Sequence, residues 1–228
     1  ATALHQARAA LLAGDCDTAV VGGVNLILDP NRLIQLGRLG ILSENGECRP
    51  FGDAANGTVM GEGAGAVIVK RLQDALEDGD RIYGVIKGTG VSTGAGSLGF
   101  TAPNPVAQAV AARRCIAAAG VDPRTISYVE THGTGTSLGD PIEVRGLAMA
   151  YEDRRLWDDA LDARLDCTLG SIKPNIGHLE AGAGVLGLIK VLLQLHHGER
   201  VPSITSPDPN PQIDFRNGAF SVQRHLEH

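Results

Sequence analysis

Residues 128–143 read YVETHGTGTSLGDPIE, a short apolar run followed by a glycine-rich turn and the start of a helix. The apolar residues 126–129 predict a strand, and His132 lies just beyond its end. Neighbouring glycines let the backbone approach a ligand closely, and Pro141 suits the first turn of the next helix. The stretch therefore predicts a strand, a turn and a helix, the repeating unit of an α/β protein.

Residues 170–184, GSIKPNIGHLEAGAG, repeat this arrangement. A predicted strand ends, a glycine turn follows, and His178 opens the next predicted helix with Lys173 five residues before it. A single histidine near a strand end is more often a structural residue than a catalyst. Two histidines in matched surroundings favour a shared site, because ligands of α/β sheets bind at the carboxyl ends of strands.

Hydrophobic patterning predicts alternating helices and strands along the rest of the chain. The predicted helices cover residues 1–13, 71–79, 105–119, 140–151 and 178–197, and the predicted strands cover residues 18–24, 63–70, 81–90, 126–130 and 167–171. Residues 30–57 are polar and irregular, which indicates helix and loop. Such alternation predicts a sheet that helices cover on both faces.

Composition excludes several classes of function. The 228 residues are 43% hydrophobic, and no run of about 18 apolar residues predicts a membrane span. A net charge of −6 with scattered basic residues argues against nucleic acid or a membrane as the main partner. The four cysteines show no CxxC spacing and no nearby histidine at metal-ligand spacing. We therefore expect reduced thiols, no metal site and a cytoplasmic protein.

The glycine-rich residues 88–99, GTGVSTGAGSLG, do not predict a nucleotide site. They lack the lysine that ends a phosphate-binding loop, and their glycines do not open a helix at the GxGxxG spacing. We interpret them as a turn-rich connection.

Both histidine stretches are similar to the two histidine motifs of the β-ketoacyl synthases, which are thiolase-like condensing enzymes. Four further segments resemble segments of this family, namely GGVN at 22–25, RPFGD at 49–53, GEG at 61–63 and TAPN at 101–104. Residues 82–90, 103–108 and 220–224 look most like ketosynthase domains of bacterial modular polyketide synthases. The resemblance covers nearly the whole chain.

This resemblance implies a thiolase-like α/β fold of layered helices and mixed β-sheets, in an incomplete form. Residues 1–80 would form the end of the N-terminal ketosynthase half, and residues 81–228 most of the C-terminal half. The family's nucleophilic cysteine opens the helix that matches residues 1–13, so it would lie before Ala1. The family's closing strand would follow His228. We therefore expect a chain truncated at both ends, without the nucleophile and inactive by itself.

The implied activity is a decarboxylative Claisen condensation in polyketide synthesis. An acyl thioester reacts with a malonyl group carried by an acyl carrier protein, whose phosphopantetheine arm delivers the substrate. The resemblance therefore implies no bound cofactor, an acyl carrier protein as partner and, as is usual in this family, a homodimer.

The resemblance also implies roles for three matched residues. His132 and His178 would each donate an imidazole N–H group to the thioester oxygen as the enolate forms, as the donors of an oxyanion hole do. Lys173 would keep His178 neutral by disfavouring the imidazolium. Alternatively, its ammonium is a structural partner of Glu143 or Glu180.

Further residues of the two motifs have expected roles. We expect Thr134, Thr136 and Asn175 to contact the substrate. We interpret Asp140 and Glu143 as structural residues that brace the turn and cap the helix.

Two other functions stay open at this point. A non-elongating, scaffold-type ketosynthase would bind acyl carrier protein without forming bonds, and the missing cysteine favours it. Retention of His132, Lys173 and His178 argues against a pure scaffold. The other alternative is a fatty-acid-type ketoacyl synthase or a thiolase-type enzyme acting on acyl-CoA. The motifs HGTGT and KPNIGH disfavour the thiolase type.

The twin motifs make a geometric prediction. The side chains of His132 and His178 should face one crevice and approach within roughly the size of one small-molecule group. A structure that places the two rings on opposite faces of the sheet would contradict the catalytic interpretation.

Overall fold

The computed structural model describes residues 2–93, 103–159, 161 and 165–228. The helices are α1 (Thr2–Ala13), α2 (Pro30–Arg38), α3 (Leu72–Glu77), α4 (Pro105–Ala119), α5 (Gly139–Tyr151), α6 (Lys173–Ile176) and α7 (Ala183–His197), with 3-10 turns η1 (Pro123–Thr125), η2 (Arg154–Leu156) and η3 (Glu180–Gly182). The strands are β1 (Thr18–Asn25), β2 (Gly63–Lys70), β3 (Tyr128–Glu130), β4 (Cys167–Gly170) and β5 (Phe220–Val222).

The strands form two separate sheets. Strands β1 and β2 pair along their whole length in an antiparallel ladder, from Thr18 opposite Lys70 to Asn25 opposite Gly63. Strands β3, β4 and β5 form a parallel sheet in that order. Parallel strands bring their carboxyl ends to one edge, so the loops after β3 and β4 lie side by side.

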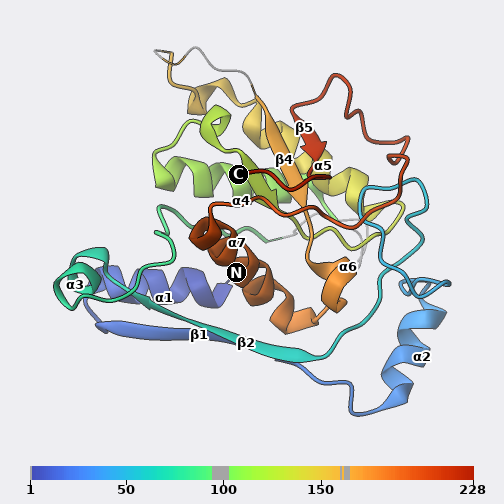
Figure 1. Cartoon of the computed structure of the whole chain (residues 1–228), viewed down its shortest axis with the longest axis horizontal. Helices are drawn as coiled ribbons and strands as arrows, with labels where there is room; N and C mark the ends of the chain where they lie inside the picture. Colours follow the sequence, from blue (N-terminus) through green and yellow to red (C-terminus); the bar gives the residue numbers. More distant parts are fainter. Residues whose placement is uncertain (1, 94–102, 160, 162–164) are drawn as a thin grey trace.

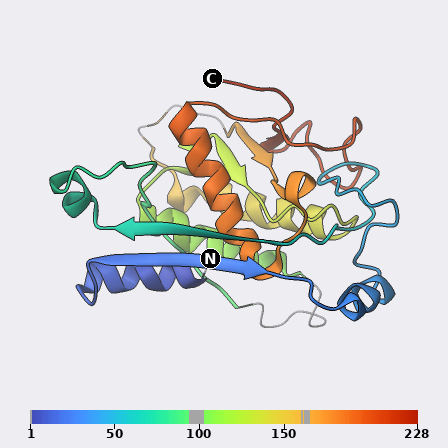
Figure 2. The same ribbon diagram turned by 60° about the horizontal axis from the view of Figure 1, so that its bottom comes forward.

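Helix α7 lies between the two sheets. Figure 1 shows the β1–β2 hairpin on one side of α7 and the three-stranded sheet with α4 and α5 on the other. In Figure 2 the same helix lies across the hairpin, while α1 runs alongside β1. The order of layers is therefore sheet, helix, sheet and helices, as expected for part of a layered α/β fold.

The main core lies between the parallel sheet and helices α4 and α5. Leu169 of β4 and Ala109 of α4 are fully buried there, and the rings of Tyr151 and Phe220 meet edge to face with centroids 5.0 Å apart. This packing supports the parallel sheet from the side of α4 and α5. Helix α7 contacts β3.

Helix α4 begins and ends where the sequence predicts. The Asn104 side chain accepts hydrogen bonds from the amides of Val106 and Ala107, and Pro105 occupies the first turn. Gly120 ends the helix in a left-handed conformation with φ of 61°. Two residues of the TAPN segment, Thr101 and Ala102, lie outside the described residues, as do residues 94–99 of the glycine-rich stretch.

Most predicted elements are confirmed within a few residues. The predicted strands at 18–24, 63–70, 126–130 and 167–171 are β1, β2, β3 and β4, and the predicted helices at 1–13, 71–79, 105–119 and 140–151 are α1, α3, α4 and α5. The irregular 30–57 stretch contains α2 and otherwise loops. No helix in the described part of the chain is long and apolar enough to cross a membrane.

The predicted strand at residues 81–90 is wrong. Within the described residues this segment belongs to neither sheet, and helices flank it. Arg8 of α1 donates to the carbonyl of Lys87, and the Cys115 thiol of α4 donates to the carbonyl of Gly88. Two carbonyl groups of this segment therefore accept hydrogen bonds from side chains instead of from a neighbouring strand. An apolar pattern in the sequence does not show which kind of partner a backbone group will have.

The predicted helix at 178–197 begins later than expected, at Ala183. The backbone amide of His178 donates to the carbonyl of Val59, and the His178 carbonyl accepts from the amide of Gly61. These two hydrogen bonds tie His178 to the segment before β2, so its backbone is not available for the first helical turn.

The prediction that helices cover both sheet faces is wrong for the outer face of the hairpin. Val20 of β1 and its cross-strand partner Ile68 of β2 are 71% and 74% exposed, whereas the next residue along, Val21, is 7% exposed. An apolar face of this kind on an isolated chain favours association.

We expect the paired substitutions Val20→Thr and Ile68→Thr to raise the soluble fraction of this chain and to lower its light scattering. Threonine keeps the β-branched shape that a strand favours and removes apolar surface from water. As a matched control, Val21→Thr buries a hydroxyl and should instead lower the free energy of unfolding by roughly 1–3 kcal/mol. Unchanged scattering of the paired variant would contradict this expectation.

Candidate active site

The loop after β3 carries His132, and the carboxylate of Glu143 holds this loop. The backbone amide of His132 donates to Glu143 Oε1 at 2.6 Å, and the amide of Gly133 donates to Oε2 at 2.8 Å. Glu143 lies in the first turns of α5, so the helix fixes the loop that precedes it. Burial raises the pKa of Glu143, and the two amides lower it.

A second carboxylate of α5 joins this loop to a distant segment. Asp140 is 1% exposed, and its side chain accepts hydrogen bonds from the amide of Gly135 at 3.2 Å and from the amide of Phe51 at 2.9 Å. Burial raises its pKa to about 7, against the effect of these amides. The prediction that Asp140 and Glu143 brace the turn agrees with these contacts. The prediction that they cap the helix is wrong, because α5 begins after Leu138 without a side-chain cap.

His178 lies between α6 and η3, against the chain that enters β2. A side chain at Gly61 would meet the carbonyl oxygen of Ile176 at 2.1 Å, so only glycine allows this close approach. The His178 Nδ1 atom accepts a hydrogen bond from the amide of Glu180 at 2.8 Å. The proton of the neutral ring is therefore on Nε2, which leaves an N–H donor free to point away from the backbone.

The structure confirms the predicted convergence of the two histidines. The ring centroids of His132 and His178 are 5.1 Å apart, with the ring planes at 85°. Partial burial, the charge of Lys173 and the ring of His178 lower the pKa of His132 to about 4. Burial and Lys173 also lower the pKa of His178. Both rings are therefore neutral near pH 7 and can each donate one N–H group.

Lys173 is the cation that faces both rings. It begins α6 and is 4% exposed. Burial lowers its pKa, while the charges of Glu143 and Glu130 raise it. Glu180, one of its two predicted partners, instead pairs with Arg32 at 2.7 Å.

Two clefts meet at Lys173. A cleft of about 220 Å³ is lined by Lys173, His132, Glu130 and residues of α7. A second cleft of about 400 Å³ is lined by Lys173, Cys48 and Asn175 among others. His132 and Lys173 both line the smaller cleft, whereas His178 lines neither of the two. The prediction that both histidines face one crevice therefore stays a prediction, although their rings lie close together.

The three predicted substrate contacts are less closely grouped. Asn175 is exposed on α6 and lines only the larger cleft. The hydroxyls of Thr134 and Thr136 lie 3.3 Å apart in the loop before α5, and Thr136 Oγ1 accepts from the amide of Gly139 at 3.2 Å. Neither threonine lines the two clefts, so their substrate contacts stay predictions.

The cysteines are poorly suited to nucleophilic catalysis. Burial, with Asp140 nearby, raises the pKa of Cys48 to about 11, and burial raises that of Cys167 to about 12. Burial also raises the pKa of Cys115. Cys16 lies in the turn before β1, at the end of the hairpin away from His178. In the described residues, no group of three or more histidine, cysteine, aspartate or glutamate side chains could hold a metal ion.

Glu130 is a residue of the site that sequence reasoning did not single out. It ends β3 and lines the smaller cleft beside His132 and Lys173. A charged residue at the end of an otherwise apolar strand is a signal that could have indicated its role.

Comparisons with known proteins identify the family of the chain. The family model "Beta-ketoacyl synthase, N-terminal domain" matches residues 1–75, and the model "Beta-ketoacyl synthase, C-terminal domain" matches residues 83–206. The chain belongs to the β-ketoacyl synthase family.

Relatives place it among polyketide synthase sequences. The chain is 47% identical over 226 residues to polyketide synthase PksL and 49% identical over 222 residues to PksM, both of Bacillus subtilis. These alignments cover 99% and 97% of this chain but only 5% of each relative. The chain therefore spans a small part of the curated relatives that it matches.

Solved structures confirm the thiolase-like ketosynthase fold. The ketosynthase from module 6 of the bacillaene synthase of Bacillus subtilis matches 98% of this chain at 42% identity with a TM-score of 0.92. The oxazolomycin ketosynthase domain OzmH KS7 of Streptomyces albus matches 99% at 44% identity, also with a TM-score of 0.92. The chain spans 39% of the length of each.

We expect Lys173→Met to raise the pKa of both His132 and His178. The ammonium lowers both values, so its replacement by an uncharged side chain of similar length should shift them upward by about one unit, the scale of one nearby charge. Imidazole resonances followed by NMR against pH measure the shift. Lys87→Met, at an exposed lysine on the 81–90 segment, is the control and should change neither value. Unshifted titrations in Lys173→Met would show that the lysine does not tune the rings.

Proposed function

We propose that this chain forms part of a ketosynthase that catalyses decarboxylative Claisen condensation of an acyl thioester with malonyl-acyl carrier protein in polyketide synthesis. One observation carries the proposal above others. His132 and His178 face each other at 5.1 Å, and burial and Lys173 favour the neutral form of both rings. This arrangement offers two N–H donors to one oxygen atom.

Decarboxylation creates the need for these donors. As the bond between the malonyl carboxylate and Cα breaks, carbon dioxide leaves and the bonding electrons move to the thioester oxygen as an enolate. Donors aimed at that oxygen stabilise the transition state more than the ground state. His178 would donate from Nε2, because Nδ1 already accepts from the amide of Glu180. His132 would donate as a neutral ring, since its pKa is about 4.

The second step consumes the enolate. Its α-carbon attacks the carbonyl carbon of the acyl thioester, the new carbon–carbon bond forms, and the thiolate that carried the acyl group leaves. The two buried cysteines, Cys48 and Cys167, are poor candidates for that thiolate because burial raises their pKa values. We therefore place the acyl-bearing nucleophile outside this chain and expect the chain by itself to form no acyl-enzyme.

The wider assignment follows the same proposal. Residues 1–80 would belong to the N-terminal half of the ketosynthase and residues 81–228 to its C-terminal half, a division that the family matches at 1–75 and 83–206 support. An acyl carrier protein would deliver the malonyl group on its phosphopantetheine arm. The complete ketosynthase would act as a cytoplasmic homodimer.

A scaffold-type ketosynthase is the second candidate, because no cysteine of the chain is suited to be the nucleophile. It would bind acyl carrier protein without chemistry. A scaffold would not need the paired neutral imidazoles or the buried Lys173. Their presence therefore favours the enzymatic function.

We expect His132→Ala and His178→Ala, each in the complete ketosynthase, to slow carbon dioxide release from malonyl-acyl carrier protein about a hundredfold. Loss of one oxyanion donor costs about 3 kcal/mol. Acyl transfer to the nucleophile, which does not pass through the enolate, should suffer less. The exposed His225 supplies the control His225→Ala, which should release carbon dioxide at the unmutated rate. If both site variants also keep that rate, the scaffold reading replaces the enzyme reading.

A further inference from the structure

The Glu130 side chain accepts hydrogen bonds from its own strand and from two distant parts of the chain. Its side chain is 9% exposed. Its Oε1 atom accepts from the backbone amide of Ile172 at 2.7 Å. Its Oε2 atom accepts from the Tyr128 hydroxyl at 2.6 Å and from Lys190 Nζ at 2.8 Å.

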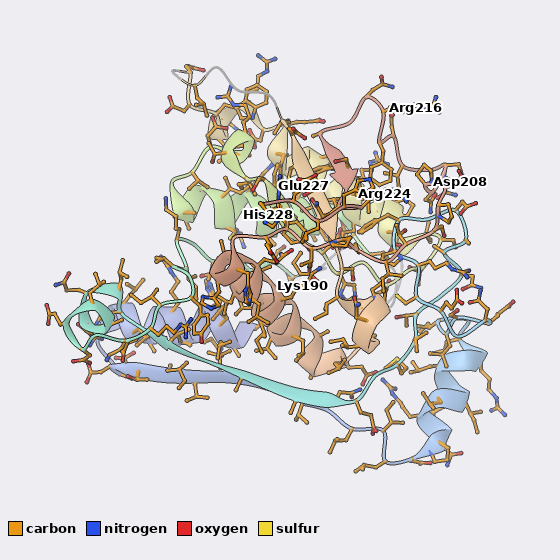
Figure 3. The ribbon with its side chains drawn as sticks, viewed as in Figure 1. Lys190, Asp208, Arg216, Arg224, Glu227 and His228 are labelled. Atoms are coloured by element: carbon orange, nitrogen blue, oxygen red, sulfur yellow. The ribbon has the colours of Figure 1, made fainter. Side chains whose placement is uncertain are left out.

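Each of the segments that meet at Glu130 leads to a residue of the site. Glu130 precedes His132 by two residues, and Ile172 directly precedes Lys173. Lys190 projects from α7, the helix that follows His178, toward the parallel sheet (Figure 3). One side chain therefore links the end of β3, the backbone just before Lys173, and helix α7, which begins at Ala183 after His178.

The carboxylate of Glu130 has little freedom to move. It forms an ion pair with Lys190 in which both side chains are largely buried, and Lys190 Nζ also donates to the Tyr128 hydroxyl at 2.8 Å. A buried charge that loses such a partner is left uncompensated at high cost. The closed set of hydrogen bonds thus favours one position of the carboxylate, and with it one position of Ile172.

Helix α7 approaches Glu130 closely at Gly187, where the helix has no side chain. A Cβ atom at Gly187 would lie 3.1 Å from Glu130 Cγ, closer than side chains normally pack. The helical backbone at Gly187 would accept residues other than glycine. Glycine is needed there because the Glu130 side chain lies so close. The helix therefore confines the Glu130 side chain from the side opposite the strand.

We propose that Glu130 is a positioning residue that holds Lys173 in place against His132 and His178 by fixing the backbone amide of Ile172. The proposal rests on the proposed function, because it assigns Glu130 to the same enolate-stabilising site. Lys190 anchors the Glu130 carboxylate from α7.

The direction in which the histidine pKa values change distinguishes a positioning role of Glu130 from a direct effect of its negative charge. The groups that face Lys173 come from five parts of the chain: Glu130 of β3, His132 of the loop after β3, Glu143 and Asp140 of α5, Cys48 of the loop before β2, and His178 between α6 and η3. Loss of an anion, by itself, disfavours imidazolium and lowers a histidine pKa. Displacement of Lys173 away from the rings raises it.

The first test follows the imidazole resonances of His132 and His178 by NMR against pH in this chain. In Glu130→Ala, both pKa values should rise by about one unit, toward the ordinary value near 6.5. Glu130→Gln keeps an oxygen for the Ile172 amide and should stay near the unmutated values. Gly187→Ala favours the helix but crowds Glu130, so it should raise both values in a chain that remains folded.

A matched control removes a different buried carboxylate. Asp122 accepts from the amides of Arg124 and Asp158 at 2.8 and 2.5 Å, before β3 rather than after it. Asp122→Asn should lower the melting temperature without shifting either histidine. Unchanged or lowered histidine pKa values in Glu130→Ala and Gly187→Ala would overturn the proposal. An equal rise in Asp122→Asn would also overturn it, because general loosening would then explain the shift.

The second test measures carbon dioxide release from malonyl-acyl carrier protein by the complete ketosynthase. In Glu130→Ala, the acid limb of the pH–rate profile should shift to higher pH, by the same number of pH units as the histidine pKa values rise. If the NMR shifts occur but the unmutated ketosynthase releases no carbon dioxide, the proposed function fails and the positioning role of Glu130 stands. If carbon dioxide is released and the acid limb does not move, the positioning role fails.

Discussion

The structure of the site depends on the hydrogen bonds that the Glu143 carboxylate accepts from the amides of His132 and Gly133. A glycine-rich loop has no sheet partners for these amides, and a buried amide without a partner costs free energy. One side chain of α5 supplies both acceptors and thereby fixes the direction in which His132 leaves β3. Asp140, one turn earlier, does the same for Gly135 and also holds Phe51. Because α5 packs in the core, its two carboxylates hold the loop that carries His132 in a fixed position.

Three carboxylates act on the charge of Lys173. Glu130, Glu143 and Asp140 are acidic, and each accepts backbone amides that hold a loop in place. Lys190 pairs with Glu130, and the charge of Lys173 helps to lower the pKa values of both histidines. The carboxylates therefore stabilise the loops, whereas the charge of Lys173 favours the neutral form of both imidazoles.

The two regions that match separate family models meet in one site. The segment before β2 belongs to the N-terminal match, and it bonds to the backbone of His178 through Val59 and Gly61. Helix α7 then packs between the hairpin and the parallel sheet (Figure 1). The hairpin and the segment that enters it therefore support the backbone of His178, and the hairpin is also an outer layer of the fold.

The sequence by itself determined the alternation of helices and strands, the family and the pairing of His132 with His178. Those features follow from local patterns: apolar runs, glycine turns, and a histidine placed after each of two neighbouring strands. Tertiary structure alone decided that Arg81–Gly90 is not a strand, that His178 carries its proton on Nε2, and that Glu130 joins the site to Lys190. Each of these depends on a hydrogen-bond partner brought close by folding, and no local pattern records which partner that will be.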